Sequence, residues 1–313
     1  MAFERLKQLA DRAGRQIGNP PGKALRGLVL AVWILGAALL AWLAWKYWPE
    51  IAPYLQQANP AILASSFLGY LLSIVSATLG WSLIMRPLFP RLRWGLHSRI
   101  YSITLIARRL PGTLWYVGGR LMLYQAEGIS KAYVAFASGL EIVVLVATGL
   151  GLGLVLLPGS ASFTLPALAG GLLSAVFVFS SPRIITWIIK RRGLTLERTP
   201  MALDALGWIL AFTATWLCGG AIVFLVIRAF VEIDLAQFGY VLGAWAFSGA
   251  IGTLTIFLPS SFGLAEISLS LLLSRIIPLP LAGAVAIIVR LLTILYDFAI
   301  AAAFYPFLRK PTK

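Results

Sequence analysis

Long apolar segments are the feature that most constrains the fold of this chain. A bilayer core about 30 Å thick needs about 20 apolar residues for each helix that crosses it. Six runs meet this requirement, and we expect each to span: 27–48, 61–85, 132–157, 164–181, 203–227 and 281–308. Of the 313 residues, 60% are hydrophobic and only 12% are charged, whereas soluble domains are about 25% charged. The sequence therefore predicts an all-α polytopic membrane protein.

The positive residues are concentrated in alternate connections between these runs. The basic connections are 1–23, 86–99, 183–198 and 309–313. The connections 49–60 and 158–163 contain no Lys or Arg. Because basic loops stay on the cytoplasmic side, we expect both termini to be cytoplasmic and the protein to lie in the cell (inner) membrane. The net charge of +15 is then explained by loops that face anionic lipid, and we expect no nucleic-acid partner.

We expect three regions along the chain. Residues 1–23 form a basic N-terminal segment with apolar positions at helical spacing, which suits an amphipathic helix on the inner leaflet or a frayed tail. Residues 24–308 form a single transmembrane domain. Residues 309–313 form a basic tail.

Residues 98–125 form an apolar stretch whose two ends are both predicted to be cytoplasmic. Pro111-Gly112 interrupts it directly after Arg108, Arg109 and Leu110. Proline removes a backbone donor and restricts the residue before it, so a helix breaks here. Irregular backbone at membrane depth is tolerated where other helices shield it from lipid. We therefore predict a re-entrant hairpin of two half-helices.

Residues 237–277 form a second interrupted stretch, whose two ends are predicted to be external. The break runs from Leu258-Pro259 to Gly263. We predict a second re-entrant hairpin that opens the opposite way, giving about six spans plus two hairpins in an inverted repeat. The alternative is that 238–258, which is long enough, crosses the membrane on its own.

The charged residues support the inverted repeat. The first hairpin carries Arg120 and the span after it carries Glu141, whereas the second hairpin carries Glu266 and the span after it carries Arg290. Similar positions thus hold charges of exchanged sign. A chance match remains the alternative.

Ionisable groups inside a membrane cost about 2.5–3.5 kcal/mol each on insertion scales, so they mark candidate sites. Arg109, at the first hairpin tip, suits a phosphate because guanidinium binds it bidentately. The half-helix after Pro111-Gly112 would direct its positive end to the same place. We rank Arg108 and Arg275 lower. The alternative is unspecific contact with anionic lipid at the interface.

The other candidate translocation residues are expected to pair or to line the pathway. Glu141 needs a cationic partner, for which Arg120 and Arg290 are the candidates. Glu266 also suits a helix N-terminus. Arg290 and Asp297 are seven residues apart and share a helix face. The alternative for all of them is a set of structural ion pairs.

Other chemistry has little support in the sequence. The single His97 excludes sites that need two histidines and is expected to be interfacial; the single Cys218 excludes an intrachain disulfide. Nucleotide, zinc-protease and hydrolase motifs are absent. We expect no metal, no cofactor and no enzymatic activity.

At its two breaks the sequence resembles a known family. The matching pieces are Pro111-Gly112 with Gly119-Arg120, Gly128-Ile129-Ser130, Glu141, Leu258-Pro259-x-x-x-Gly263-Leu264-x-Glu266, and Arg290. These resemble the lysylphosphatidylglycerol synthase transmembrane region, a flippase-like family, over most of 24–308. Ser260-Ser261-Phe262 departs from the Pro- or Gly-rich stretch common in relatives, so the substrate is expected to differ.

The resemblance implies movement of a lipid between leaflets. We expect a translocator of a phospholipid or lipid-linked glycan with an anionic or phosphate-bearing headgroup. No soluble synthase region accompanies it, so lipid aminoacylation is not expected. The alternative is a non-transporting accessory subunit of a lipid or glycolipid synthase. A lipid-modifying enzyme or glycosyltransferase would be the partner, and a homo-oligomer is compatible with the sequence.

Overall fold

The structure is a computed structural model that describes most of the chain between residues 58 and 306. The described residues are 58–89, 94–109, 115–157, 183–191, 196, 198–254 and 263–306, with isolated positions between 34 and 56. Within them the regular structure is helical. The predicted segment 1–23, the tail 309–313 and the span 164–181 lie outside the described residues, as does most of 27–48.

Four long apolar helices form the framework, and they confirm four of the six expected runs. They are α3 (Pro60–Met85), α6 (Lys131–Leu156), α8 (Ala202–Arg228) and α11 (Leu279–Phe304). Each has 26 or 27 residues, which at 1.5 Å per residue gives about 40 Å, enough to cross a bilayer. The chain therefore has the fold of an all-α membrane protein.

Local side-chain hydrogen bonds place the starts of these helices. Asn59 Oδ1 accepts a hydrogen bond from Ala61 N (3.0 Å), and Pro60 follows at the first helical position of α3. Ser130 Oγ accepts from Ala132 N (3.4 Å) at the start of α6. Such bonds satisfy backbone donors that have no partner within the helix. The start of α6 sets how far along the helix Glu141 lies, and therefore its depth in the membrane.

The first interrupted stretch is a pair of short helices, as predicted. It contains α4 (Trp94–Thr104), the 3₁₀ turn η1 (Ile106–Arg109) and α5 (Trp115–Ala126). Neither α4 nor α5 is long enough to cross a bilayer, since 12 residues rise only about 18 Å and the hydrocarbon core is about 30 Å thick. α4 packs against α5, and both contact neighbouring long helices. Pro111 and Gly112, at the predicted tip, lie outside the described residues.

The second interrupted stretch is also divided into two helices. After the turn η2 (Leu235–Gln237) come α9 (Phe238–Leu254) and α10 (Leu264–Leu273), which pack together. α9 has 17 residues, or about 26 Å, which is less than a 30 Å core. The break itself, including Pro259, lies outside the described residues. The number of spans therefore stays a prediction.

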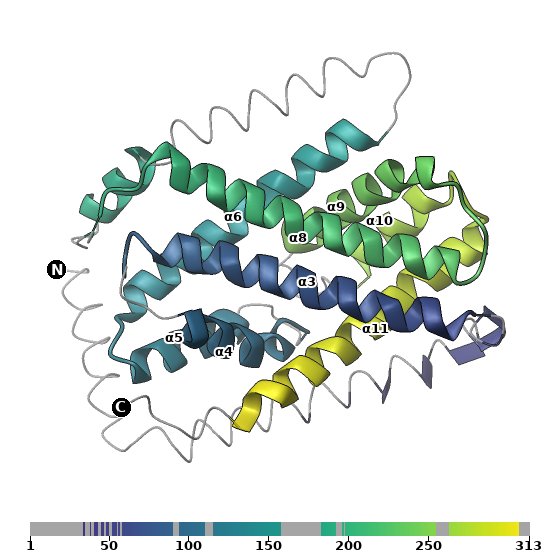
Figure 1. Cartoon of the computed structure of the whole chain (residues 1–313), viewed down its shortest axis with the longest axis horizontal. Helices are drawn as coiled ribbons and strands as arrows, with labels where there is room; N and C mark the ends of the chain where they lie inside the picture. The colour runs from purple at the N-terminus through teal and green to yellow at the C-terminus, as the bar shows by residue number, and fades with distance from the viewer. Residues whose placement is uncertain are drawn as a thin grey trace.

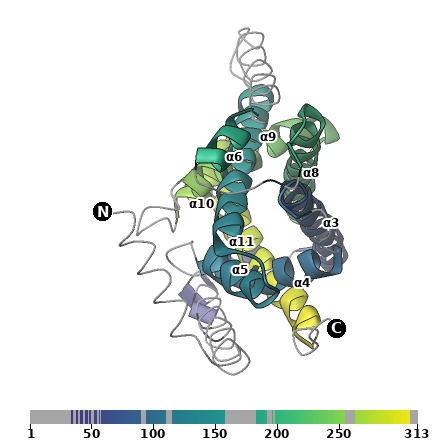
Figure 2. The same cartoon turned by 90° about the vertical axis from the view of Figure 1, so that its left-hand side faces the viewer.

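The two helix pairs lie toward opposite ends of the molecule (Figure 1). Each is followed along the chain by a long helix, α6 after α5 and α11 after α10. α3 lies beside α8 on one side, and α6 and α11 lie on the other (Figure 2). α9 packs closely on α6 and α8. Glycines permit this approach: a Cβ on Gly149 of α6 would lie 2.9 Å from the carbonyl oxygen of Ala246 on α9.

Candidate functional site

Arg120 and Glu141 form a buried ion pair between the first hairpin and the long helix after it. Arg120 lies on α5 and Glu141 on α6, and their side chains are 1% and 2% exposed. Arg120 Nη1 donates to Glu141 Oε2. The turn between α5 and α6 passes through Gly128 at φ 82°, a conformation that glycine adopts without strain. Of the two partners expected for Glu141, the structure selects Arg120.

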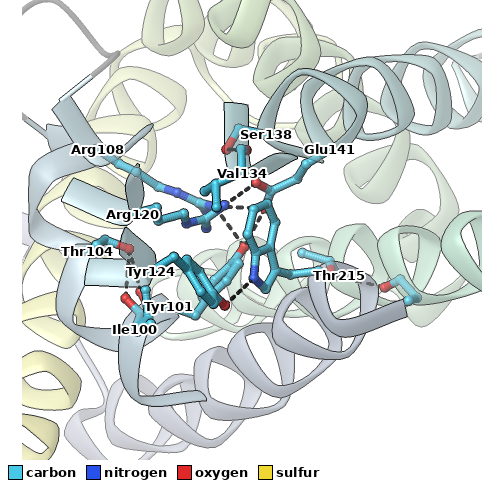
Figure 3. Close-up of polar contacts among 12 residues, drawn as sticks. Ile100, Tyr101, Thr104, Arg108, Arg120, Tyr124, Val134, Ser138, Glu141 and Thr215 are labelled. Atoms are coloured by element: carbon cyan, nitrogen blue, oxygen red, sulfur yellow. Dashed lines mark hydrogen bonds and ion pairs between the residues drawn. The ribbon is translucent and has the colours of Figure 1, made fainter. Parts of the chain in front are cut away.

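Arg108 brings a second guanidinium to the same carboxylate (Figure 3). Its Nη2 lies 3.1 Å from Glu141 Oε1 and donates to the Tyr101 hydroxyl at 2.7 Å. Tyr101 OH in turn donates to Glu141 Oε1 at 3.0 Å. Two cations therefore share one anion. The Arg108 side chain is 30% exposed, so the excess positive charge is accessible.

Aromatic rings enclose the two guanidiniums. Arg120 Cζ lies 4.3 Å from the ring centres of both Trp81 and Tyr101 and 5.1 Å from that of Tyr116. Arg108 Cζ lies 4.9 Å from Tyr101 and 5.0 Å from Tyr116. Ring faces attract cations most strongly where water is absent. The cage thus offsets part of the cost of burying two arginines beside one carboxylate.

A hydrogen-bonded group at Tyr124 ties this hairpin to α3. The Tyr124 hydroxyl accepts from Trp81 Nε1 (2.7 Å), and His97 Nδ1 lies 2.7 Å from the same oxygen. His97 is 2% exposed and lies on α4, so it is a buried helix residue and not part of a loop, whereas its interfacial position stays a prediction. α4 begins at Trp94, so His97 lies in its first turn, among the buried residues of the helix. These contacts hold α4, α5 and α3 together beside the charged pair.

The second hairpin carries the matching pair with the charges exchanged. Glu266 on α10 and Arg290 on α11 form an ion pair, with Oε1 and Nη1 3.1 Å apart. Both side chains are about a quarter exposed. Glu266 Oε2 also accepts from the backbone N of Gly263 (3.2 Å), so it serves as a first-turn helix acid as well. In each half, a charge on the second short helix pairs with the long helix that follows.

Asp297 is a buried acid of α11 that faces α3. It is 2% exposed and accepts a hydrogen bond from the Tyr70 hydroxyl. The neighbouring Tyr296 hydroxyl lies 2.8 Å from Ser66 Oγ. These contacts fix α11 against α3.

Removing the Tyr70 hydroxyl tests the role of Asp297. We expect Tyr70→Phe to lower the free energy of unfolding by about 1–3 kcal/mol, since a buried carboxylate loses a donor. Thermal unfolding in detergent, compared with the half-buried Tyr54→Phe, would measure this loss. A loss equal to that of the control variant would show that Asp297 does not depend on Tyr70.

Some predicted site residues lie where the structure gives no side chain. Pro111, Gly112 and Pro259 are outside the described residues, and so is the side chain of Arg109. Arg109 is the last residue of η1, next to Arg108, so its phosphate-binding role stays a prediction. The aromatic partners were not anticipated, because they come from three helices. Within the described residues, no three metal-ligating side chains are clustered.

Comparison with known proteins adds no identification. No protein-family model matches the chain, and no curated protein sequence matches it significantly. The resemblance to the lysylphosphatidylglycerol synthase transmembrane region stays a prediction.

Proposed function

We propose that this protein translocates an anionic, phosphate-bearing lipid between the leaflets of the cell membrane. The observation that carries the proposal is the unequal charge of the first-hairpin site, where Glu141 is the one carboxylate among the described residues that pairs with Arg108 and Arg120. An uncompensated cation at membrane depth is costly. A phosphate bound there would neutralise it. Guanidinium suits this role because it keeps its charge and presents paired donors.

The site has donors to offer such a ligand. Arg120 Nε and Nη2 are buried and have no hydrogen-bond partner within the described residues. Buried donors are rarely left without a partner, and those that are call for a physical explanation. A phosphate oxygen that entered beside the more exposed Arg108 would satisfy them. In this scheme Arg108 receives the headgroup and Arg120 holds it, while the acyl chains stay in lipid.

The two helix pairs support a translocator in preference to a simple binding protein. Inverted-repeat transporters place their sites between two oppositely oriented halves and open them alternately to each side. The exchanged ion pairs Arg120–Glu141 and Glu266–Arg290 provide corresponding contacts in the two halves. Cytoplasmic termini, the flippase-like resemblance and an inner-membrane location belong to the same proposal.

One observation favours the accessory-subunit alternative. Arg120 and Glu141 are closed off in this conformation and tied to three helices, as expected for a purely structural cluster. A lipid-modifying enzyme or glycosyltransferase would then be the functional partner. Direct measurement of lipid exchange separates the two functions.

We expect Arg108→Gln to reduce exchange of anionic lipid at least about tenfold, since one charge-assisted hydrogen bond is worth about 1.5–3 kcal/mol. The measurement is leaflet exchange in proteoliposomes with fluorescent anionic, zwitterionic and polyprenyl-phosphate lipids. The matched control is Arg86→Gln, an exposed arginine in the turn after α3 that lies outside the site.

The result has two contrary outcomes. If Arg108→Gln exchanges anionic lipid as fast as the unchanged chain, the lipid does not pass through the first-hairpin site. Exchange no faster than in empty liposomes, for every lipid class, would support the accessory subunit instead.

A further inference from the structure

A hollow of about 490 Å³ lies far from the charged site. Its walls are the C-terminal end of α6, the turn η2 with the start of α9, and the turn between α10 and α11. Leu156, Gln237 and Arg275 come from these three places. All three wall segments are helix ends, so the hollow lies at an edge of the bundle and opens outward.

The position of the hollow along α6 sets its depth. Glu141 and Leu156 are both on α6, fifteen residues apart, which corresponds to about 22 Å along the helix axis. The charged site belongs to the first half of α6 and the hollow to its last turn. By the loop charges, that last turn is at the external face. The two features therefore lie at different depths in the membrane.

The lining of the hollow is amphipathic. Arg275 supplies an exposed guanidinium and Gln237 an amide, whereas Val155, Leu156 and Ile276 supply apolar surface. Tyr240 also lines it, but its hydroxyl donates to the carbonyl oxygen of Leu272 (2.7 Å) and so holds α9 against α10. No carboxylate of the described residues forms an ion pair with Arg275.

These features fit the polar end of a lipid. A phosphate would lie against Arg275, because guanidinium binds phosphate oxygens in pairs. The glycerol and the first methylenes of the acyl chains would lie on the apolar wall, as amphipathic ligands do in pockets with few polar groups. A soluble phosphate compound would gain nothing from that wall.

We propose that this hollow is a second lipid site, at the external mouth, which holds the phosphate of an anionic phospholipid through Arg275. As the place where lipid that has passed Arg108 and Arg120 leaves the protein, this site rests on the proposed function. As a binding site for anionic lipid at the C-terminal end of α6, it does not. In this site Arg275 binds the phosphate, and the Gln237 amide supplies a further polar group beside it.

The test places a photoreactive benzophenone side chain at Ala236, which lines the hollow. The full chain is reconstituted in nanodiscs with equal amounts of phosphatidylglycerol and phosphatidylcholine, each with a clickable acyl chain. Illumination and mass spectrometry then give the ratio of the two labelled lipids. We expect at least about fivefold preference for phosphatidylglycerol, given the strength of charge-assisted hydrogen bonds.

Three variants identify the origin of the preference. Arg275→Gln is expected to bring the ratio close to one, and Arg275→Lys to restore part of it. Arg228→Gln makes the same charge change at an exposed residue that does not line the hollow, and it is expected to keep the preference. A ratio that Arg275→Gln leaves unchanged overturns the proposal. So does loss of labelling on addition of millimolar glycerol phosphate, which would identify a site for free phosphate.

Failure here is distinguishable from failure of the proposed function. Preference at Ala236 without leaflet exchange would keep the lipid site and reject translocation. Exchange that is abolished by Arg108→Gln, combined with no preference at Ala236, would keep translocation and reject the second site.

Discussion

Glu141→Gln is expected to lower the free energy of unfolding by about 3–5 kcal/mol, the range for removing one partner of a buried ion pair. The substitution keeps the size of the side chain but leaves Arg108 and Arg120 together without a carboxylate. Both guanidiniums lie within 5.1 Å of shared aromatic rings, so they cannot separate without disturbing the cage. The first hairpin should therefore loosen from α6.

The matched control is Glu266→Gln, which makes the same change in the corresponding pair of the second half. That pair is about a quarter exposed, so its charges are less enclosed by protein than those of Arg120 and Glu141, and its loss should cost less. The glutamine oxygen can still accept from Gly263 N at the start of α10. Unfolding of both variants in bicelles gives the comparison. Equal losses would show that burial does not distinguish the two pairs.

The long helices were predictable because their signal is local. The run 132–157 corresponds to α6 (Lys131–Leu156) and the run 203–227 to α8 (Ala202–Arg228). An uninterrupted apolar segment of this length has one low-energy structure in a membrane, since every backbone group bonds within it. The short helices were predictable for the converse reason: Pro111 and Pro259 prevent one helix from continuing.

The charged site was only partly predictable. A carboxylate at membrane depth needs a cationic partner, so a cation near Glu141 was predictable, and Arg120 was one of the two candidates. The contact of Arg108 with Glu141 depends on the direction of the Arg108 side chain, which the sequence does not give and only the packed fold decides. The rings of Trp81, Tyr101 and Tyr116 meet from α3, α4 and α5, and no sequence spacing encodes that meeting.

α6 and α9 approach closely where Gly149 of α6 faces Ala246 and Ala250 of α9. A Cβ on Gly149 would lie 2.8 Å from Trp216 Cζ2, 2.9 Å from Ala246 O and 3.0 Å from Ala250 Cβ. The backbone oxygen cannot move without shifting α9. Trp216 is also held, because its Nε1 donates to Leu145 O and Thr148 Oγ1, each at 3.1 Å. A larger side chain therefore forces the two helices apart.

Gly149→Val is expected to lower the free energy of unfolding by about 1–3 kcal/mol through overpacking. Gly151→Val is the matched control, because the same helix gains the same side chain at a position with nothing within 4 Å of the added Cβ. Both variants share the change in helix propensity, so their difference isolates the contact. Unfolding in bicelles measures stability, and leaflet exchange measures function. Equal unfolding would contradict the close packing, whereas a stability difference with equal exchange would mean that α9 can separate from α6 without affecting the pathway.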